Sequence, residues 1–243
     1  MTETRHLDYW RHSLENIARL RDISKISQPV AVHKSAELRT KRLPSKAKNL
    51  AADLAYILGV IKGDGCVSVA QRRVILSATD KDFVSEFKRA LENWSEFSAR
   101  FYSRDIKKPV YIKNRKTQWV SYIDSKDAAE FLADFDVHKI QTSSAEIKCA
   151  FLKGLFDSEG SVSKDSVIFY NSNFRIIELV YNLLTDLGIE PKINHYKAKS
   201  LSGKEISYSR VCIYKKDSLR KFANLVGFSI VRKADKLRAL VEN

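Results

Sequence analysis

Residues 57–65 of this chain read ILGVIKGDG and residues 152–160 read LKGLFDSEG, so one short pattern occurs twice in 243 residues. Each copy is an apolar stretch of helical character with Gly at its third position, and each ends in an acid followed by Gly. An internal repeat of this kind indicates two similar halves. Each half supplies one carboxylate, Asp64 or Glu159, and the repeat predicts that the two acids meet.

The charge of the chain restricts the class of partner. Lys and Arg number 43 against 29 Asp and Glu, which gives a formal net charge of +14. Such an excess favours a polyanionic partner, most often nucleic acid, although a basic surface that is merely solvated is the alternative. Two carboxylates brought together in a basic protein indicate metal-assisted chemistry on a phosphodiester.

Several other kinds of site have no support in the sequence. Cys66, Cys149 and Cys212 are widely spaced, odd in number and set among apolar neighbours, so we expect small core residues rather than disulfides or zinc ligands. The histidines form no catalytic pattern, and there is no Gly-rich phosphate loop. No apolar run reaches the roughly 18 to 20 residues of a membrane span, and no secretory signal is visible. We therefore expect an intracellular, cytoplasmic protein without a membrane partner, and encoding in an organelle stays open as the alternative.

The chain is expected to contain an extension and two halves. Residues 1–50 are assigned to a basic N-terminal extension, in which residues 6–23 have the spacing of an amphipathic helix. Residues 31–50 carry six Lys or Arg against one acid and predict a linker or arm outside the core. The first half is assigned to residues 51–143 and the second to residues 144–243.

Hydrophobic periodicity predicts the order αββαββα in each half, which is an α+β fold with antiparallel sheets covered by helices on one face. The predicted helices cover residues 54–65, 82–94, 126–135, a stretch ending at 160, 174–187, 218–226 and 232–241. The predicted strands cover residues 66–69, 74–78, 99–104, 111–123, 161–163, 167–171, 189–197 and 206–214.

The strand faces without helices are expected to form a DNA-binding saddle, because basic residues are enriched at equivalent places in both halves. Lys and Arg on such strands neutralise phosphates and reach base edges in the major groove. The alternative is that Lys-rich strand faces only prevent edge pairing. The candidate DNA-binding residues are Arg72, Arg73, Arg100, Arg104, Lys107, Lys108, Lys113, Arg115, Lys116, Lys164, Lys192, Lys197, Lys199, Lys204 and Arg210.

The two motif copies, their spacing and the repeated element order resemble the LAGLIDADG homing endonucleases, specifically the single-chain class with two motifs. The resemblance covers roughly residues 51–241. It implies a monomeric enzyme that makes a double-strand break in a long, near-asymmetric DNA target, as in intron homing. The absence of intein splice junctions favours a free-standing enzyme.

The resemblance also implies a metal site between the halves. Small residues on one face let two motif helices approach closely, and here they are Gly59, Gly63, Gly154 and Ser158. Two adjacent carboxylates do not both ionise cheaply without a divalent cation. In the family these acids bind Mg²⁺, so we expect a metal site made of Asp64, Glu159, Gly63 and Ser158 that holds Mg²⁺ or another divalent cation such as Mn²⁺.

In the family, polar and basic residues surround the metals. The matching positions are Asn171 and Arg175 after the second strand of the second half, and Lys126 and Lys216 at the start of the helix after each fourth strand. The first half departs from the pattern, since Ala78 stands where Asn171 stands in the second. We therefore expect two unequal half-sites.

Two functions without cleavage remain open. Members of the fold act as RNA-splicing maturases, which would make RNA a partner, or in degenerate form as DNA-binding regulators. A structural protein that wraps DNA without sequence preference is a third possibility. The pair of acids favours the endonuclease, because a protein that only binds has no need of them.

Overall fold

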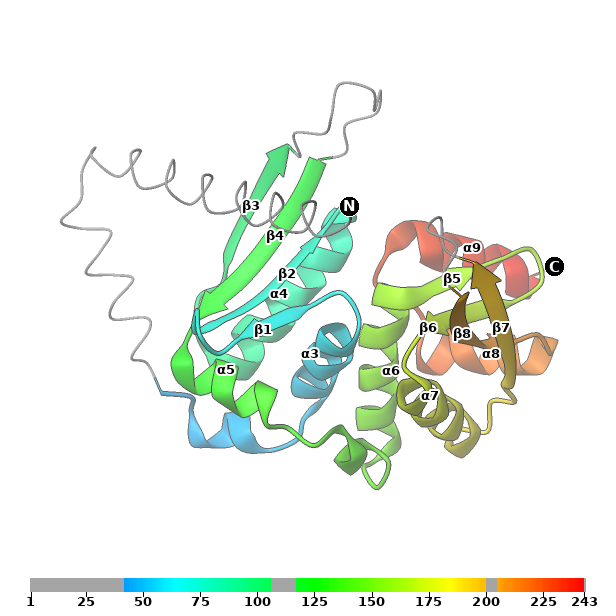
Figure 1. Ribbon diagram of the computed structural model, residues 1–243, viewed down its shortest axis with the longest axis horizontal. Helices are drawn as coiled ribbons and strands as arrows, with labels where there is room; N and C mark the ends of the chain where they lie inside the picture. Colours follow the sequence, from blue (N-terminus) through cyan, green and yellow to red (C-terminus); the bar gives the residue numbers. More distant parts are fainter. Residues whose placement is uncertain (1–41, 106–116, 200–204, 243) are drawn as a thin grey trace. The chain divides into compact units, whose positions relative to one another are not determined.

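Two four-stranded antiparallel sheets organise the chain. The computed structural model describes residues 42–105, 117–199 and 205–242, with the backbone alone at 197–199 and 205–207 (Figure 1). The strand order is β1-β2-β4-β3 in the first sheet and β5-β6-β8-β7 in the second, so the two sheets have the same topology. The predicted α+β fold with two αββαββα halves is confirmed.

The first half begins with the motif helix α3 and alternates strand pairs with helices. Its elements are η2 (Ser45–Lys48), α3 (Ala52–Lys62), β1 (Cys66–Ser68), β2 (Arg73–Ala78), α4 (Lys81–Ser95), β3 (Arg100–Asp105), β4 (Thr117–Asp124), α5 (Lys126–Ala133) and η3 (Val137–Ile140). The helix α3 ends three residues before its predicted limit, because Gly63 leaves the helical conformation at φ −106° and ψ −108°.

The second half repeats this order and adds one helix. Its elements are α6 (Ala145–Glu159), β5 (Gly160–Val162), β6 (Val167–Asn171), α7 (Phe174–Asp186), β7 (Lys192–Lys199), β8 (Glu205–Ile213), α8 (Lys216–Leu225) and α9 (Val231–Glu242). The helix α9 has no counterpart in the described part of the first half.

Each sheet buries one face under helices. In β2 the alternate residues Val74 and Leu76 are fully buried, while Ile75 between them is only partly buried. The helix α4 packs on the buried face with an apolar stripe that includes Phe83, Phe87 and Leu91. This alternation of period two opposite a helical stripe is the pattern that the sequence predicted.

The expectation that every cysteine lies in the core is wrong for Cys66, which is exposed. Cys66 pairs with Ile75, so it lies on the sheet face opposite the buried Val74. Apolar neighbours in sequence misled the prediction, because successive residues of a strand point to opposite faces. Cys149 is partly buried and Cys212 is buried.

The expectation that residues 31–50 stay outside the core is wrong at its end. Leu43 and Ala47 are buried, and the Trp94 Nε1 donates a hydrogen bond of 2.7 Å to the carbonyl oxygen of Ala47. The two buried residues give too short a pattern to detect by periodicity. The predicted helix over residues 6–23 lies outside the described residues.

Candidate functional site

The two motif helices cross in direct backbone contact. A Cβ atom placed on Gly59 would lie 2.2 Å from the carbonyl oxygen of Phe151, and one on Gly154 would lie 2.3 Å from that of Tyr56. Only glycine fits at such distances, since real Cβ contacts essentially never fall below 3.0 Å. Gly59 and Gly154, at the third position of each motif, therefore let α3 and α6 lie side by side (Figure 1).

This crossing brings the acidic ends of the motifs together. A Cβ on Gly63 would lie 2.3 Å from the Ser158 Cβ and 3.5 Å from the Glu159 Cγ. Asp64 follows Gly63 directly, so its backbone starts beside the second acid. The predicted meeting of Asp64 and Glu159 agrees with this packing.

The electrostatics of the two acids reflect that proximity. The Asp64 side chain reaches solvent, yet the surrounding protein removes part of its hydration and raises its pKa. Loss of hydration also raises the pKa of Glu159, and the negative charge of Asp64 raises it further. The ammonium group of Lys233 opposes both shifts. Both carboxylates are therefore harder to ionise here than in water.

A third motif acid, Asp157, has a different role. It is buried, and it accepts hydrogen bonds from the Tyr56 hydroxyl at 3.0 Å, from the Ser229 backbone N–H at 2.9 Å and from the Ser229 hydroxyl. Burial raises the pKa of Asp157, and these hydrogen bonds oppose the rise. Asp157 therefore ties α6 to α3 and to the segment before α9. Sequence reasoning missed this role, although an acid inside an apolar helix was a signal.

A buried lysine outside the repeat, Lys233 on α9, was also missed. Its side chain is 6% exposed, and its Nζ donates to the carbonyl oxygens of Phe156 at 3.0 Å and Asp157 at 2.6 Å. Burial lowers the pKa of Lys233 to about 8.

Asn171 and Arg175 lie near the end of the second sheet that is adjacent to Glu159. β5 begins at Gly160 opposite Phe169, and β6 continues past that level to Asn171, on the side of Glu159. The Asn171 Oδ1 accepts a hydrogen bond of 2.8 Å from the backbone N–H of Asn173. Arg175 is exposed in the first turn of α7.

Lys126 and Lys216 are equivalent in the two halves, as predicted, because each begins the helix after a fourth strand. The register of the strands separates them from the acids. β4 ends at Asp124 opposite Arg73, which is the start of β2, whereas the acid lies toward the other end of β2. β8 likewise ends opposite the start of β6. The structure does not bring these lysines to the acids, and we leave them out of the proposed catalytic group.

On the uncovered face of the first sheet, basic and aromatic side chains interleave. The guanidinium of Arg73 lies 4.1 Å from the Tyr122 ring centroid and forms two hydrogen bonds with Asp124, of 2.7 and 3.1 Å. Arg100 lies 5.9 Å from the same ring, and the Arg104 Nε donates to Gln118 at 2.8 Å. Part of this positive charge is therefore already engaged within the protein.

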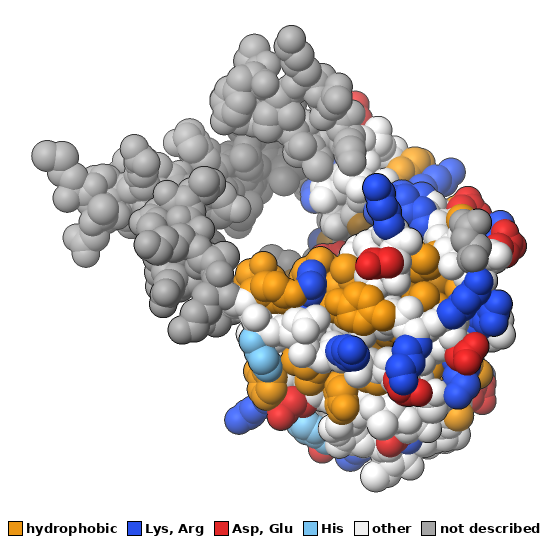
Figure 2. Space-filling model, turned by 90° about the vertical axis from the view of Figure 1, so that its right-hand side faces the viewer, with side chains coloured by type: hydrophobic (Ala, Val, Ile, Leu, Met, Phe, Trp, Pro, Cys, Tyr) orange, Lys and Arg blue, Asp and Glu red, His pale blue; other side chains and the backbone are white. Residues whose placement is uncertain are grey.

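The second sheet shows the same combination. The guanidinium of Arg210 lies 4.4 Å from the Tyr196 ring centroid, and Tyr196 stacks on Tyr208 at 5.4 Å. The Arg210 Nε is buried and has no hydrogen-bond partner within the described part of the chain. Lys192 is exposed on a neighbouring strand. Figure 2, which faces the second half, shows Lys and Arg interspersed with acidic and apolar side chains.

Other candidate DNA-binding residues lie in turns or outside the described residues. Arg72 has a positive φ of 55° in the turn between β1 and β2, and Lys164 lies in the turn between β5 and β6. Lys107, Lys108, Lys113, Arg115, Lys116 and Lys204 lie outside the described residues, and the side chains of Lys197 and Lys199 are not described.

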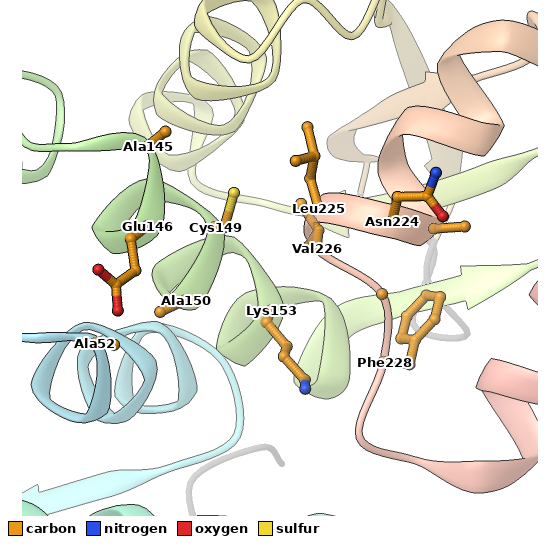
Figure 3. A pocket seen from close by; sticks show the side chains of 12 residues that line it. Ala52, Ala145, Glu146, Cys149, Ala150, Lys153, Asn224, Leu225, Val226 and Phe228 are labelled. Atoms are coloured by element: carbon orange, nitrogen blue, oxygen red, sulfur yellow. The ribbon is translucent and has the colours of Figure 1, made fainter.

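A hollow of about 640 Å³ lies between α6 and the end of α8 (Figure 3). Its lining includes Cys149, Lys153, Val226 and Phe228 but neither acid of the pair.

None of the helices in the described residues has both the length and the apolar character that a membrane span requires.

Comparison with known proteins supports the resemblance. The family model of the LAGLIDADG-like domain matches residues 51–135 and 146–227, more than half of the chain. An uncharacterised protein of Methanocaldococcus jannaschii is 32% identical over 188 residues, which span 70% of this chain and 69% of that one. The homing endonuclease I-DmoI of Desulfurococcus mucosus is 22% identical over 154 residues, which span 60% of this chain and 76% of that one.

Solved structures share the fold. I-DmoI in complex with DNA and Ca matches with a TM-score of 0.54 at 18% identity, over 79% of this chain and 99% of that one. The N-terminal LAGLIDADG domain of DUF199/WhiA matches with a TM-score of 0.51 at 15% identity, over 89% of this chain and 98% of that one. With both motifs, both sheets and the family model in agreement, this chain belongs to the LAGLIDADG family.

Proposed function

We propose that this protein is a divalent-metal-dependent, site-specific DNA endonuclease that makes a double-strand break in a long, near-asymmetric target. The observation that carries the proposal is the convergence of Asp64 and Glu159 at the ends of two helices in backbone contact. This crossing requires glycine and places two like charges close together. Such charges repel each other unless a cation binds between them. One acid from each half provides one carboxylate for each DNA strand.

The residues present suit a divalent cation. Carboxylate oxygens are the ligands that Mg²⁺ prefers in proteins, and Mg²⁺ is commonly held by one or two carboxylates together with substrate phosphates. Among the described residues no group of three or more His, Cys, Asp or Glu side chains forms a complete metal site. Asp64 and Glu159 would therefore hold Mg²⁺ or Mn²⁺ together with DNA and water. A bound cation supplies an activated water and stabilises the leaving oxygen.

The other residues of the chain bind and orient the DNA. Asn171 and Arg175, at the acid-bearing end of the second sheet, would contact the phosphate next to Glu159. The interleaved basic and aromatic side chains on the uncovered sheet faces would contact the DNA backbone and bases, since Arg and Tyr combine charge with a flat apolar surface. Both acids belong to one chain, so a monomer suffices. Homing, as for a free-standing intron-encoded enzyme, is the biological role that we propose.

The named relatives support this function by analogy. I-DmoI is named a homing endonuclease, and its structures contain DNA with Ca or Mn. The DUF199/WhiA domain has the same fold. The second candidate for this chain is a protein of this fold that binds DNA or RNA without cutting it. The small Ala78 in the first half is consistent with either candidate, because it removes one polar group from that half-site.

Cleavage of a randomised library separates the two candidates. The protein is incubated with random duplexes in Mg²⁺ or in EDTA, and the cut ends are sequenced. The endonuclease predicts specific double-strand cuts in Mg²⁺ that vanish in EDTA and in Glu159→Gln. Tight binding without cuts in Mg²⁺ or Mn²⁺ would instead establish the binding protein.

A further inference from the structure

The helices that follow β2 and β6 begin in the same way in the two halves. Asp80 is the N-cap residue of α4 and Asn173 that of α7, and each cap comes two residues after the end of its strand. Two positions further along, the first half has Asp82 where the second half has Arg175. The cation that the second half places near the end of its sheet is therefore replaced by an acid in the first half.

This replacement is unfavourable for a protein that binds DNA. Asp80 and Asp82 follow Ala78, the last residue of β2. That end of β2 lies toward Asp64, because the register of β1 on β2 runs from Arg73 opposite Ser68 to Ile75 opposite Cys66. Like charges repel, so these two acids would weaken the binding of a phosphate there unless a cation of the protein lies beside them.

The first turn of α9 supplies such a cation from outside the repeat. The Nε and Nη2 groups of Arg232 each donate a hydrogen bond of 2.7 Å to one carboxylate oxygen of Asp80. The backbone N–H of Val231 donates to Asp82 at 2.5 Å. The side chain of Asp80 is 22% exposed and that of Arg232 is 60% exposed. The arginine is therefore the partner that faces solvent.

An arginine held in this way keeps donors for a second partner. A guanidinium group has five N–H donors in one plane, and a side-on pair with a carboxylate uses one donor on Nε and one on Nη2. The Nη1 side of the plane points away from Asp80. Phosphate oxygens accept hydrogen bonds from such a planar group in a fixed geometry. Because Asp80 already orients the guanidinium, less side-chain freedom is lost when a phosphate binds.

We propose that Arg232 contacts a DNA phosphate at the first half-site, in the role that we assign to Arg175 at the second. The inference rests on the proposed function of the protein on DNA. It explains how two halves with unequal polar residues can each hold one strand. The alternative is that Arg232 only clasps α9 to α4, and exposed ion pairs of that kind contribute little to stability.

Removing one DNA charge at a time tests the contact. A duplex recovered from the library is made with single methylphosphonate linkages near the cut positions, each of which removes the charge of one phosphate. Affinity is measured in Ca²⁺ by fluorescence anisotropy. We expect Arg232→Gln to bind the unmodified duplex roughly 5- to 20-fold more weakly than the wild type. One linkage that weakens binding of the wild type should have no further effect in Arg232→Gln.

Arg175→Gln identifies the half-site. The linkage that loses its effect in Arg175→Gln should lie on the other strand from the linkage that loses its effect in Arg232→Gln. Arg238→Gln is the matched control, because Arg238 is exposed on the same helix and pairs with Asp235 within it. It should keep the affinity of the wild type and the same sensitive linkages.

Two results would overturn the phosphate contact. In the first, Arg232→Gln binds with the affinity of Arg238→Gln and keeps every sensitive linkage, whatever its Tm, and the arginine is then a clasp alone. In the second, Arg232→Gln and Arg175→Gln lose the effect of the same linkage, so that Arg232 serves no separate half-site.

Binding and cleavage keep this inference and the proposed function apart. If the wild type binds duplexes and cuts none, the endonuclease proposal fails, and the linkage experiment on a duplex selected by binding still decides the contact. If the wild type cuts and Arg232→Gln binds and cuts equally well, the contact fails and the endonuclease stands. If the wild type binds no duplex, both fail.

Discussion

Replacing Gly154 by Ala tests the helix crossing on which the acid pair depends. The added Cβ would lie 2.3 Å from the carbonyl oxygen of Tyr56 and 2.9 Å from the backbone nitrogen of Val60. Ordinary contact begins near 3.4 Å, so α3 and α6 must separate by about 1 Å. Both neighbouring atoms are backbone atoms, and neither can rotate away as a side chain would.

The cost follows from two opposing effects. Overpacking of this kind costs about 1 to 3 kcal/mol, and a backbone clash belongs at the upper end. Opening the interface by about 1 Å also forfeits a quarter to a half of the dispersion energy of the facing atoms. The higher helix propensity of Ala offsets about 1 kcal/mol of this loss in stability. We expect a net loss of about 2 kcal/mol, which lowers Tm by roughly 4 to 8 °C in a protein of this size.

Calorimetry measures this shift, and Asn182→Ala on α7 is the matched control. Asn182 is exposed in a helix, so that variant gains propensity without a clash and should keep or slightly raise Tm. Cleavage by Gly154→Ala should fall with the displacement of Glu159. A Tm that rises in Gly154→Ala as it does in Asn182→Ala would refute the close crossing.

Three smaller perturbations test other contacts. Tyr56→Phe removes the hydroxyl that donates to buried Asp157 at 3.0 Å and should cost about 1 to 3 kcal/mol in urea unfolding, and an unchanged midpoint would contradict the bond. The Arg89 hydrogen bonds hold the pKa of Glu86 below its ordinary value. Their contribution to stability is complete at a pH above the ordinary pKa, and it is lost as the pH falls through the lowered pKa. Arg89→Gln should therefore lower stability by about 0.5 kcal/mol at neutral pH and leave it unchanged in strong acid, and an equal effect at both would disprove the assignment. Arg210→Gln should weaken DNA binding by about 1 to 3 kcal/mol at constant salt in fluorescence anisotropy, with Tm preserved, and unaltered affinity would remove Arg210 from the DNA surface.

The fold and the acid pair were accessible from the sequence for a physical reason. A close helix crossing demands small residues at fixed intervals, and Gly59 and Gly154 occupy the same place in the two copies. The acid follows each crossing at the same distance, so the repeat alone predicts that Asp64 and Glu159 meet. The strand alternation around Val74 and Leu76 likewise follows from burial of one face.

The rest depends on contacts that leave no local pattern. Lys233 bonds to residues more than 70 positions earlier in the chain, and a single lysine on a terminal helix looks like a solvated charge. For Lys126 the sequence predicted a role at the acids that the structure does not support. Its match with Lys216 reflects the shared helix start after a fourth strand, and equivalence in a repeat does not reveal which end of the sheet that start occupies.

Strand-resolved cleavage tests the central claim most directly. A target recovered from the library is labelled at each 5′ end, and nicking of each strand in Mg²⁺ is followed for the wild type, Asp64→Asn and Glu159→Gln. The account predicts that the wild type cuts both strands, that each acid variant loses cutting of at least one strand, and that the double variant cuts neither while still binding the target. A double variant that cuts both strands at the wild-type rate would contradict the account.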